Sequence, residues 1–307
     1  MGKDSNSTRI TKQQLHILEL IYRFRFVSTK HIKFWLDKQY LREAQQLLQT
    51  LLSKDYIGRN YTTKAKLHGE YASYYLLPKG LKVLKNYQDS FPEASSAKLN
   101  IPAQANQRVY RDKTASAMFI RHNLSLADAN IGFRRCYSQT GLSFYAKNEL
   151  HGYSCFPKQL PDAYVSIRDN IAGTNCQDGS TGAKVNTSRS DSPTRRNHYF
   201  LELCEEAIPA FVYRRKIISY IHYAETGLWE KTAQTSLPAL LLLCESQRQK
   251  HRLLKVAAYE ADHSFIPLTI KTTTWQQLGE AKPDEPIWQV ADIEKKTVEG
   301  LTVGSSK

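Results

Sequence analysis

The hydrophobic periodicity changes from helical to strand-like within the first 90 residues, and this change constrains the fold more than any other feature of the sequence. Apolar residues first recur at helical spacing, as at Leu15, Leu18 and Ile21. The pattern predicts a second helix from Ser28 and a third, amphipathic helix over residues 41–54. The aromatic run 71–77 predicts a strand that ends at Pro78. Three helices, a hairpin and a closing helix predict a winged helix-turn-helix over residues 1–88.

The outward face of the third expected helix carries side chains suited to DNA. In a winged helix-turn-helix this helix enters the major groove, where Gln and Arg bond base edges and Lys neutralises phosphates. The candidate DNA-contacting residues there are Arg42, Gln45, Gln46, Gln49 and Lys54. The polar segment between the two expected strands predicts a basic wing tip, with candidate residues Arg59, Lys64, Lys66 and His68. Winged helices also bind other proteins, so that alternative stays open.

Positive charge is concentrated at the start of the chain. The formal net charge is +14, and the first 90 residues hold 16 Lys and Arg against 7 Asp and Glu. Because a general basic bias would spread along the chain, this asymmetry favours one polyanion-binding end. No apolar run approaches the roughly 18 residues of a membrane-spanning helix, and we expect no secretory signal and no membrane contact. The five cysteines form no CxxC pair, which disfavours a zinc site or disulfide framework and favours the cytoplasm.

The rest of the chain predicts a linker, a second domain and a tail. Residues 89–107 are rich in Ser, Ala, Asn, Gln and Pro without periodicity, which is typical of a linker. Residues 108–275 alternate helical patterns with short strand-like runs, the last at 265–270, and predict an α/β domain with a mixed sheet. Residues 169–197 are expected to form a loop, and 276–307 a C-terminal tail. The fold class expected for the whole chain is α+β.

Two carboxylates lie on strands that are expected to be neighbours in the second domain. Asp162 follows a proline at the start of one strand, and Glu202 lies within the next. Two such carboxylates suit oxygen ligation of a divalent cation. Their order resembles the PD-(D/E)xK core of restriction-endonuclease-like proteins. That resemblance implies Mg²⁺ at Asp162 and Glu202, and a catalytic Lys two residues beyond the glutamate.

The sequence departs from the nuclease pattern at the lysine position. Cys204 stands there, and a neutral thiol does not supply the charge of an ammonium group. Lys216, or Arg214 and Arg215, on the following helix would have to substitute for it. The departure therefore indicates a degenerate core that is not an enzyme and needs no cofactor, with Mg²⁺ required only if the site is active. In a further alternative the two carboxylates have no shared function: Asp162 is a turn residue at the start of its strand, and Glu202 is a solvated strand residue.

The order of these parts resembles the replication-relaxation family over most of residues 11–275. The segments that carry the resemblance include YYLLPKGLKVL, RHNLSLADANIGF, LPDAYVSI, HYFLELCEE and ALLLLCESQRQKHRLLKVA. The family usually has an acid two residues after the glutamate of the Phe-Leu-Glu motif, where this chain has Cys204. The resemblance implies an accessory protein that binds DNA in the replication, relaxation or mobilisation of a plasmid or other mobile element.

Three functions remain as alternatives. The favoured one is a double-stranded-DNA-binding accessory protein, with a relaxase or replication initiator as a further partner and a homodimer as one assembly. The second is a Mg²⁺-dependent DNA nuclease that uses Asp162 and Glu202. The third is a winged-helix transcriptional regulator. The basic first third and the glutamine-rich helix face favour the first.

Overall fold

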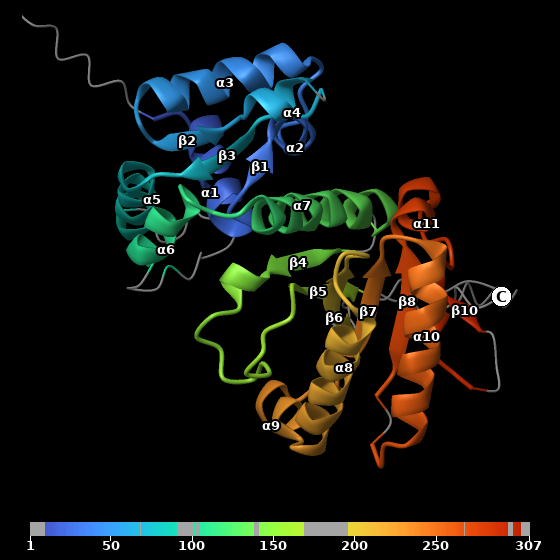
Figure 1. Ribbon diagram of the computed structural model, residues 1–307. Coiled ribbons are helices and arrows are strands. Elements are labelled where there is room, and N and C mark those ends of the chain that lie inside the picture. Colours follow the sequence, from blue (N-terminus) through green and yellow to red (C-terminus); the bar gives the residue numbers. More distant parts are fainter. Residues whose placement is uncertain are drawn as a thin grey trace, which may run out of the picture. The chain divides into compact units, whose positions relative to one another are not determined.

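The computed structural model describes residues 10–67, 69–90, 101, 105–137, 141–168, 196–266, 268–293 and 297–301. The chain divides into two compact units, each described by itself (Figure 1). Unit 1 comprises Met1–Ile131 and Tyr145–Tyr153, and unit 2 comprises Gly132–Phe144 and Ser154–Lys307.

Unit 1 combines helices with a small antiparallel sheet. Its helices are α1 (Lys12–Phe24), α2 (Thr29–Trp35), α3 (Leu41–Ser53), α4 (Thr63–Leu67), α5 (Pro78–Ser90), α6 (Ala105–Asp112), the first part of α7 (Ala117–Tyr137) and the 3-10 helix η1 (Lys147–Glu149). Its strands are β1 (Val27–Ser28), β2 (Ile57–Asn60) and β3 (Ser73–Leu76), in the order β1-β3-β2. The register pairs Ile57 with Leu76 and Val27 with Tyr74.

Apolar stripes and caps explain the first helices. Thr11 caps α1 through a reciprocal pair of bonds with Gln14, which satisfies two otherwise unpaired backbone groups at the helix start. The stripe predicted in α1 is buried, and Ile17 and Ile21 have no exposed surface. Such burial contributes roughly 1.5–3 kcal/mol for each large aliphatic side chain. The core of unit 1 therefore forms where the periodicity predicted it.

Unit 1 is larger than the expected first domain. The predicted linker 89–107 contains the start of α6, and polar contacts fasten the helices that follow it to the first helices. Arg25 of the α1 C-terminus forms an ion pair with Asp112 of α6. The Trp35 indole donates a hydrogen bond to Asn130 of α7 at 3.0 Å. These long-range contacts have no signature in local composition, so the sequence places the boundary too early.

Unit 2 is built on a seven-stranded mixed sheet. In sequence order its strands are β4 (Ser143–Ala146), β5 (Ala163–Arg168), β6 (Arg196–Cys204), β7 (Ala239–Cys244), β8 (Ile270–Thr274), β9 (Trp288–Val290) and β10 (Val298–Glu299). They lie in the spatial order β10-β9-β8-β7-β6-β5-β4. Strands β6, β7 and β8 are parallel, whereas β5 and β9 run antiparallel to their neighbours. The α+β class and the mixed sheet are therefore confirmed.

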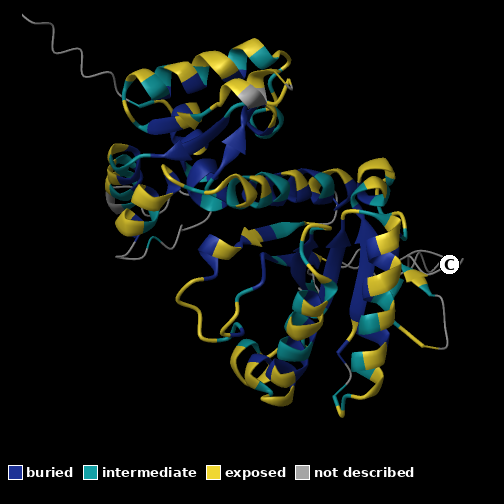
Figure 2. Cartoon of the chain, in the orientation of Figure 1, coloured by how far each residue is buried: buried dark blue, intermediate teal, exposed yellow. Residues whose placement is uncertain are grey.

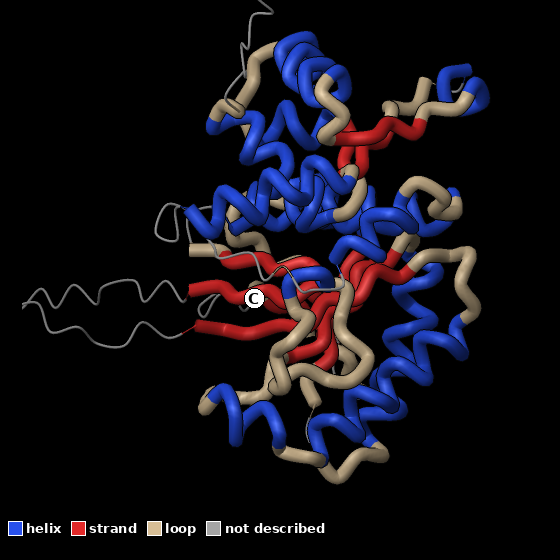
Figure 3. Tube along the Cα trace, turned by 90° about the vertical axis from the view of Figure 1, so that its left-hand side faces the viewer, coloured by secondary structure: helices blue, strands red, loops and turns tan. Residues whose placement is uncertain are grey.

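The parallel strands alternate with helices that cover one face of the sheet (Figure 3). The helices of unit 2, besides the end of α7, are α8 (Ala210–Glu225), α9 (Leu228–Ala233), α10 (Gln247–Asp262) and α11 (Trp275–Glu280). Figure 2 shows the central strands buried and the outer sides of α8 and α10 exposed. Because β7 is buried on both faces, its sequence is an uninterrupted apolar run, Ala239–Cys244.

The expected C-terminal tail is part of the sheet. Residues 276–307 contribute β9 and β10, and the strand expected at 265–270 begins only at Ile270. Trp288 of β9 is fully buried, packs against Phe133 at a ring-centroid distance of 5.9 Å and donates a hydrogen bond to the Tyr137 hydroxyl. The strands are too short for a clear alternating pattern, so composition alone did not reveal them. None of the described helices is both long and apolar enough to cross a lipid bilayer.

Gly80 provides a test of packing in unit 1. A Cβ atom at this position of α5 would overlap the Tyr56 carbonyl oxygen, which is backbone and cannot rotate away. We expect Gly80→Ala to lower the free energy of unfolding by about 1–3 kcal/mol, the usual cost of overpacking. The measurement is urea unfolding of the full chain. The control is Gly279→Ala in α11, where a Cβ meets open space and a gain of up to about 1 kcal/mol is expected. Equal effects of the two substitutions would contradict the packing described.

Candidate functional site

A groove of about 600 Å³ lies between α3 and the β2–β3 hairpin. We call it the α3–hairpin groove. Its lining consists of residues of α3, residues of the β2–β3 hairpin and Thr29. The α3 side chains lining it are those of Arg42, Gln45, Gln46 and Gln49. Hairpin residues that line it include Arg59, Tyr61, Glu70, Tyr71 and Tyr74. Five of the nine candidate DNA-contacting residues therefore line one concave surface.

The amphipathic pattern of α3 decides which of its side chains reach the groove. Ala44, Leu48 and Leu51 are fully buried and hold one face of the helix against unit 1. Residues on the opposite side of the helical wheel must then point outward. Arg42 and the three glutamines are exposed, as the sequence predicted.

Of the remaining candidates, Lys54 and Lys66 are described and are not among the residues that line the groove. Lys54 is half-buried at the C-cap of α3, where its carbonyl oxygen accepts a hydrogen bond from Lys79 at 2.7 Å. Lys66 is exposed on α4, a short helix in the segment expected to be an irregular wing tip. His68 and the side chain of Lys64 lie outside the described residues.

Two tyrosines of the groove were not singled out from the sequence. Tyr61 and Tyr71 are each 40% exposed and lie on either side of the hairpin tip. The Lys30 ammonium lies 4.5 Å from the centroid of the Tyr71 ring, a cation–π distance. Exposed tyrosines beside basic residues are typical of surfaces that bind nucleic acids. The aromatic pattern of residues 71–77, however, predicts only a strand.

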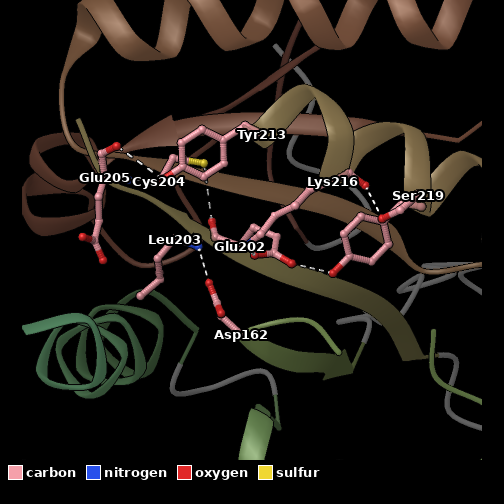
Figure 4. A network of polar contacts seen from close by, with 9 residues as sticks. Asp162, Glu202, Leu203, Cys204, Glu205, Tyr213, Lys216 and Ser219 are labelled. Atoms are coloured by element: carbon pink, nitrogen blue, oxygen red, sulfur yellow. Dashed lines mark hydrogen bonds and ion pairs between the residues drawn. The ribbon is translucent and has the colours of Figure 1, made fainter. Parts of the chain in front are cut away.

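The second candidate site is the carboxylate pair of unit 2 (Figure 4). The β5–β6 register pairs Ala163 with Leu201, so Asp162 and Glu202 stand opposite each other one step further along. The Leu203 backbone N–H donates to Asp162 Oδ2 at 3.0 Å. Asp162 is 3% exposed and Glu202 is 1% exposed. The structure thus brings the predicted pair together and excludes the interpretation of Glu202 as a solvated strand residue.

Helix α8 supplies the partners of Glu202. Lys216 Nζ lies 2.6 Å from Glu202 Oε2, and the Tyr220 hydroxyl donates to Oε1 at 2.7 Å. Lys216 and Tyr220 are four residues apart, so they share one helix face. Of the three basic residues considered as substitutes, Lys216 is the one that contacts Glu202. Arg214 instead pairs with Glu260, and the Arg215 guanidinium lies 5.4 Å from the Phe211 ring centroid.

Burial and neighbouring charges shift the pKa values of this cluster. Burial, and after it the Asp162 carboxylate, raises the pKa of Glu202 from 4.5 to about 7, although Lys216 and Tyr220 act in the opposite direction. Burial alone would lower the pKa of Lys216, but the Glu202 and Asp162 carboxylates outweigh it and raise the pKa. Burial raises the pKa of the Cys204 thiol well above its ordinary value. Cys204 is therefore neutral and cannot replace a lysine.

The residues of this cluster do not fit a Mg²⁺ site. Magnesium prefers an octahedron of oxygen ligands, and both oxygens of Glu202 already accept hydrogen bonds from Lys216 and Tyr220. In the part of the chain that the structure describes, no three His, Cys, Asp or Glu side chains are grouped to hold a metal ion. We therefore derive no metal-dependent chemistry from this arrangement.

Comparison with known sequences gives one decisive match. The sequence model of the replication-relaxation family matches residues 18–237. The chain belongs to this family. The match includes the α3–hairpin groove and the cluster of Asp162, Glu202 and Lys216, and it confirms the resemblance seen in the sequence. Membership connects this replication-relaxation protein with the replication or relaxation of plasmids and mobile elements.

The other comparisons add little to the family assignment. No curated protein matches this replication-relaxation protein. A mutant of ZitR from Lactococcus lactis is a solved structure with 17% sequence identity. The match covers 37% of this chain and 77% of that one, with a TM-score of 0.20. That score is too low to support an argument about fold or function.

The raised pKa of Glu202 predicts a pH effect on stability. The unfolded carboxyl has a pKa near 4.5 and the folded one near 7, so the folded chain holds this proton more tightly. The contribution of Glu202 to the free energy of unfolding is therefore fully present below pH 4.5 and decreases as the pH rises to about 7. We expect the difference in unfolding free energy between the parent and Glu202→Gln to decrease over that interval, as measured by urea unfolding.

A matched substitution separates this effect from general acid sensitivity. Glu280 is an exposed glutamate of α11, and Glu280→Gln should give a pH profile parallel to that of the parent. If Glu202→Gln is also parallel to the parent, the buried carboxyl does not titrate as described.

Proposed function

We propose that this replication-relaxation protein binds double-stranded DNA through the α3–hairpin groove, and that unit 1 is a winged helix-turn-helix. The observation that carries the proposal is the convergence of Arg42, three glutamines and Arg59 on one groove between a helix and a hairpin. An exposed helix of this kind matches the width of the major groove, about 12 Å.

The spacing of the α3 side chains suits the reading of consecutive base pairs. An α-helix rises about 1.5 Å per residue, so the seven steps from Arg42 to Gln49 span roughly 10 Å, or about three base-pair steps. Arg bonds guanine and Gln bonds adenine through two hydrogen bonds each. We therefore propose a core site with a guanine at the Arg42 end and adenines towards Gln49.

The hairpin supplies contacts to the DNA backbone. Arg59 is exposed and lines the groove, and Lys66 is exposed on α4. Tyr61 and Tyr71 add hydroxyl groups that can bond phosphate oxygens. The excess of positive charge in the first 90 residues supports attraction to the duplex. Glu70, an acidic residue of the lining, would disfavour close phosphate approach on its side of the groove.

The biological role proposed is that of a DNA-binding accessory protein in plasmid or mobile-element replication, relaxation or mobilisation. Family membership supports this role. Unit 2 would serve as a non-catalytic, nuclease-like module that contacts a relaxase or replication initiator. The support for a degenerate core is the cross-strand Asp162–Glu202 pair, whose glutamate oxygens both bond to side chains of α8. The geometry gives no step to a Mg²⁺-dependent nuclease.

To test DNA binding, the full-length protein selects duplexes from a pool of random sequences. Fluorescence anisotropy then measures its affinity for the selected duplexes. Affinity should decrease steeply with salt, because phosphate contacts release counterions. Arg42→Ala should cost about 1–3 kcal/mol on selected sites and relax the sequence preference, since it removes a base contact. Arg59→Ala should weaken all sequences alike and reduce the salt dependence by about one counterion.

The control variant is Lys82→Ala, which removes an exposed lysine of α5 that does not line the groove. It should bind almost as the parent does. The proposal fails if Arg42→Ala and Arg59→Ala bind like Lys82→Ala, or if the parent ignores duplex DNA at low salt.

A further inference from the structure

A pocket of about 220 Å³ lies in unit 2 between the helices α8 and α10, which pack side by side (Figure 1). We call it the α8–α10 pocket. Its lining comes from residues 206–213, which lead from β6 into α8, and from residues 248–253 in the first two turns of α10. These segments follow the carboxyl ends of the parallel strands β6 and β7, and ligands of α/β sheets commonly bind at such ends. The pocket is smaller than the roughly 300–1,000 Å³ of sites that enclose a drug-sized molecule, so it suits one small group of a ligand.

Two arginines of α10 bring positive charge to this pocket. Arg248 and Arg252 are exposed, and they share one face of the helix because they lie four residues apart. Among the residues that the structure describes, neither guanidinium has an ion pair or a hydrogen bond. Arg214 of α8, by contrast, pairs with Glu260. The two arginines therefore offer N–H donors that no acceptor in the described part of the chain uses.

The nearby acidic residues contact the start of α10 and leave the arginines without a counter-ion. Glu206 lines the pocket, and its carboxylate accepts a hydrogen bond from the hydroxyl of Ser246, the N-cap of α10. The Glu206 backbone N–H donates to Glu245 Oε2 at 2.6 Å. Since the lining contains two arginines and one glutamate, its net charge is positive.

Gln249 adds a donor that is largely buried. Its residue is 9% exposed and lines the pocket between the two arginines in sequence. Gln249 Oε1 accepts a hydrogen bond from the Glu245 backbone N–H at 2.8 Å, which leaves the amide nitrogen at the other end of the group. No acceptor among the described residues bonds this nitrogen. The pocket thus combines two guanidinium groups with one amide donor.

We propose that the α8–α10 pocket binds the phosphate group of a nucleotide, either free or within a nucleic-acid strand, through Arg248, Arg252 and Gln249. A guanidinium group bonds an oxyanion through two parallel N–H donors. One guanidinium already engages both oxygens of a carboxylate, whereas a phosphate has enough oxygens for two guanidinium groups and an amide. The size of the pocket fits the phosphate and leaves the rest of the ligand outside it.

The inference concerns unit 2 and does not rest on DNA binding by the α3–hairpin groove. Its test uses the full-length chain, isothermal titration calorimetry, and the ligands thymidine 5′-monophosphate and thymidine, which lacks the phosphate. The parent should bind the monophosphate and not thymidine. Arg248→Ala and Arg252→Ala should each weaken binding of the monophosphate roughly tenfold, because each removes charge-assisted hydrogen bonds. Both variants should fold as the parent does, since they change exposed side chains without described partners.

Two further variants make the result specific to the pocket. Gln249→Glu keeps an oxygen for the Glu245 N–H and replaces the amide donor with a negative charge, so it should abolish binding of the monophosphate. The control is Lys282→Ala, which removes an exposed lysine of unit 2 that does not line the pocket. It should bind the monophosphate as the parent does.

A short oligothymidylate distinguishes the two sources of the phosphate. It is measured in a chain that also carries Arg42→Ala and Arg59→Ala, so that binding in the α3–hairpin groove is not counted. A nucleic-acid strand is the ligand if the oligothymidylate binds more tightly than the monophosphate and Lys255→Ala weakens that binding. Lys255 is exposed on α10 seven residues beyond Arg248, where a strand anchored in the pocket can pass. Equal affinities identify a free nucleotide as the ligand.

Two results would overturn the proposal. One is that neither the monophosphate nor the oligothymidylate binds to the chain. The other is that Arg248→Ala and Arg252→Ala bind both of them as Lys282→Ala does. Neither result bears on the α3–hairpin groove, so a failure here is distinct from a failure of the proposed DNA binding.

Discussion

The burial of one face of α3 is the constraint on which the rest of unit 1 depends. Ala44, Leu48 and Leu51 have no exposed surface, and their contact with the core fixes the rotation of the helix. That rotation turns Arg42 and the glutamines towards the hairpin. A helix that rotated by one residue would bury polar side chains without partners, which costs several kcal/mol. The packing of α3 on the core therefore also decides which of its side chains line the proposed DNA-binding surface.

In unit 2 the sheet and helix α8 together fix the surroundings of two buried carboxylates. The sheet places Asp162 opposite Glu202 whatever the two residues do, because the β5–β6 register is set by apolar neighbours such as Val165 and Leu201. What the pair does is decided by α8. Lys216 and Tyr220 each bond one oxygen of Glu202, so α8 ties this carboxylate into a buried polar network.

The sequence predicts those parts of the molecule that have local causes. The α1 and α3 stripes, the strand ended by Pro78 and the pairing of Asp162 with Glu202 all follow from period, turn chemistry or strand order. It misses those parts that depend on distant contacts. Asp112 and Asn130 of unit 1 contact Arg25 and Trp35, which lie 87 and 95 residues away in the sequence. The short strand around Trp288 is likewise defined by its neighbours.

The spacing of Lys216 and Tyr220 along α8 links sequence changes in this helix to sequence changes in the sheet. Lys216 and Tyr220 bond the two oxygens of a single carboxylate, so a shift of α8 by one residue along its axis would break both bonds at once. The carboxylate therefore fixes the axial register of the helix as well as its rotation. In relatives that lack an acid at the position of Glu202, the lysine and the tyrosine lose their common acceptor, and all three positions should change as a group.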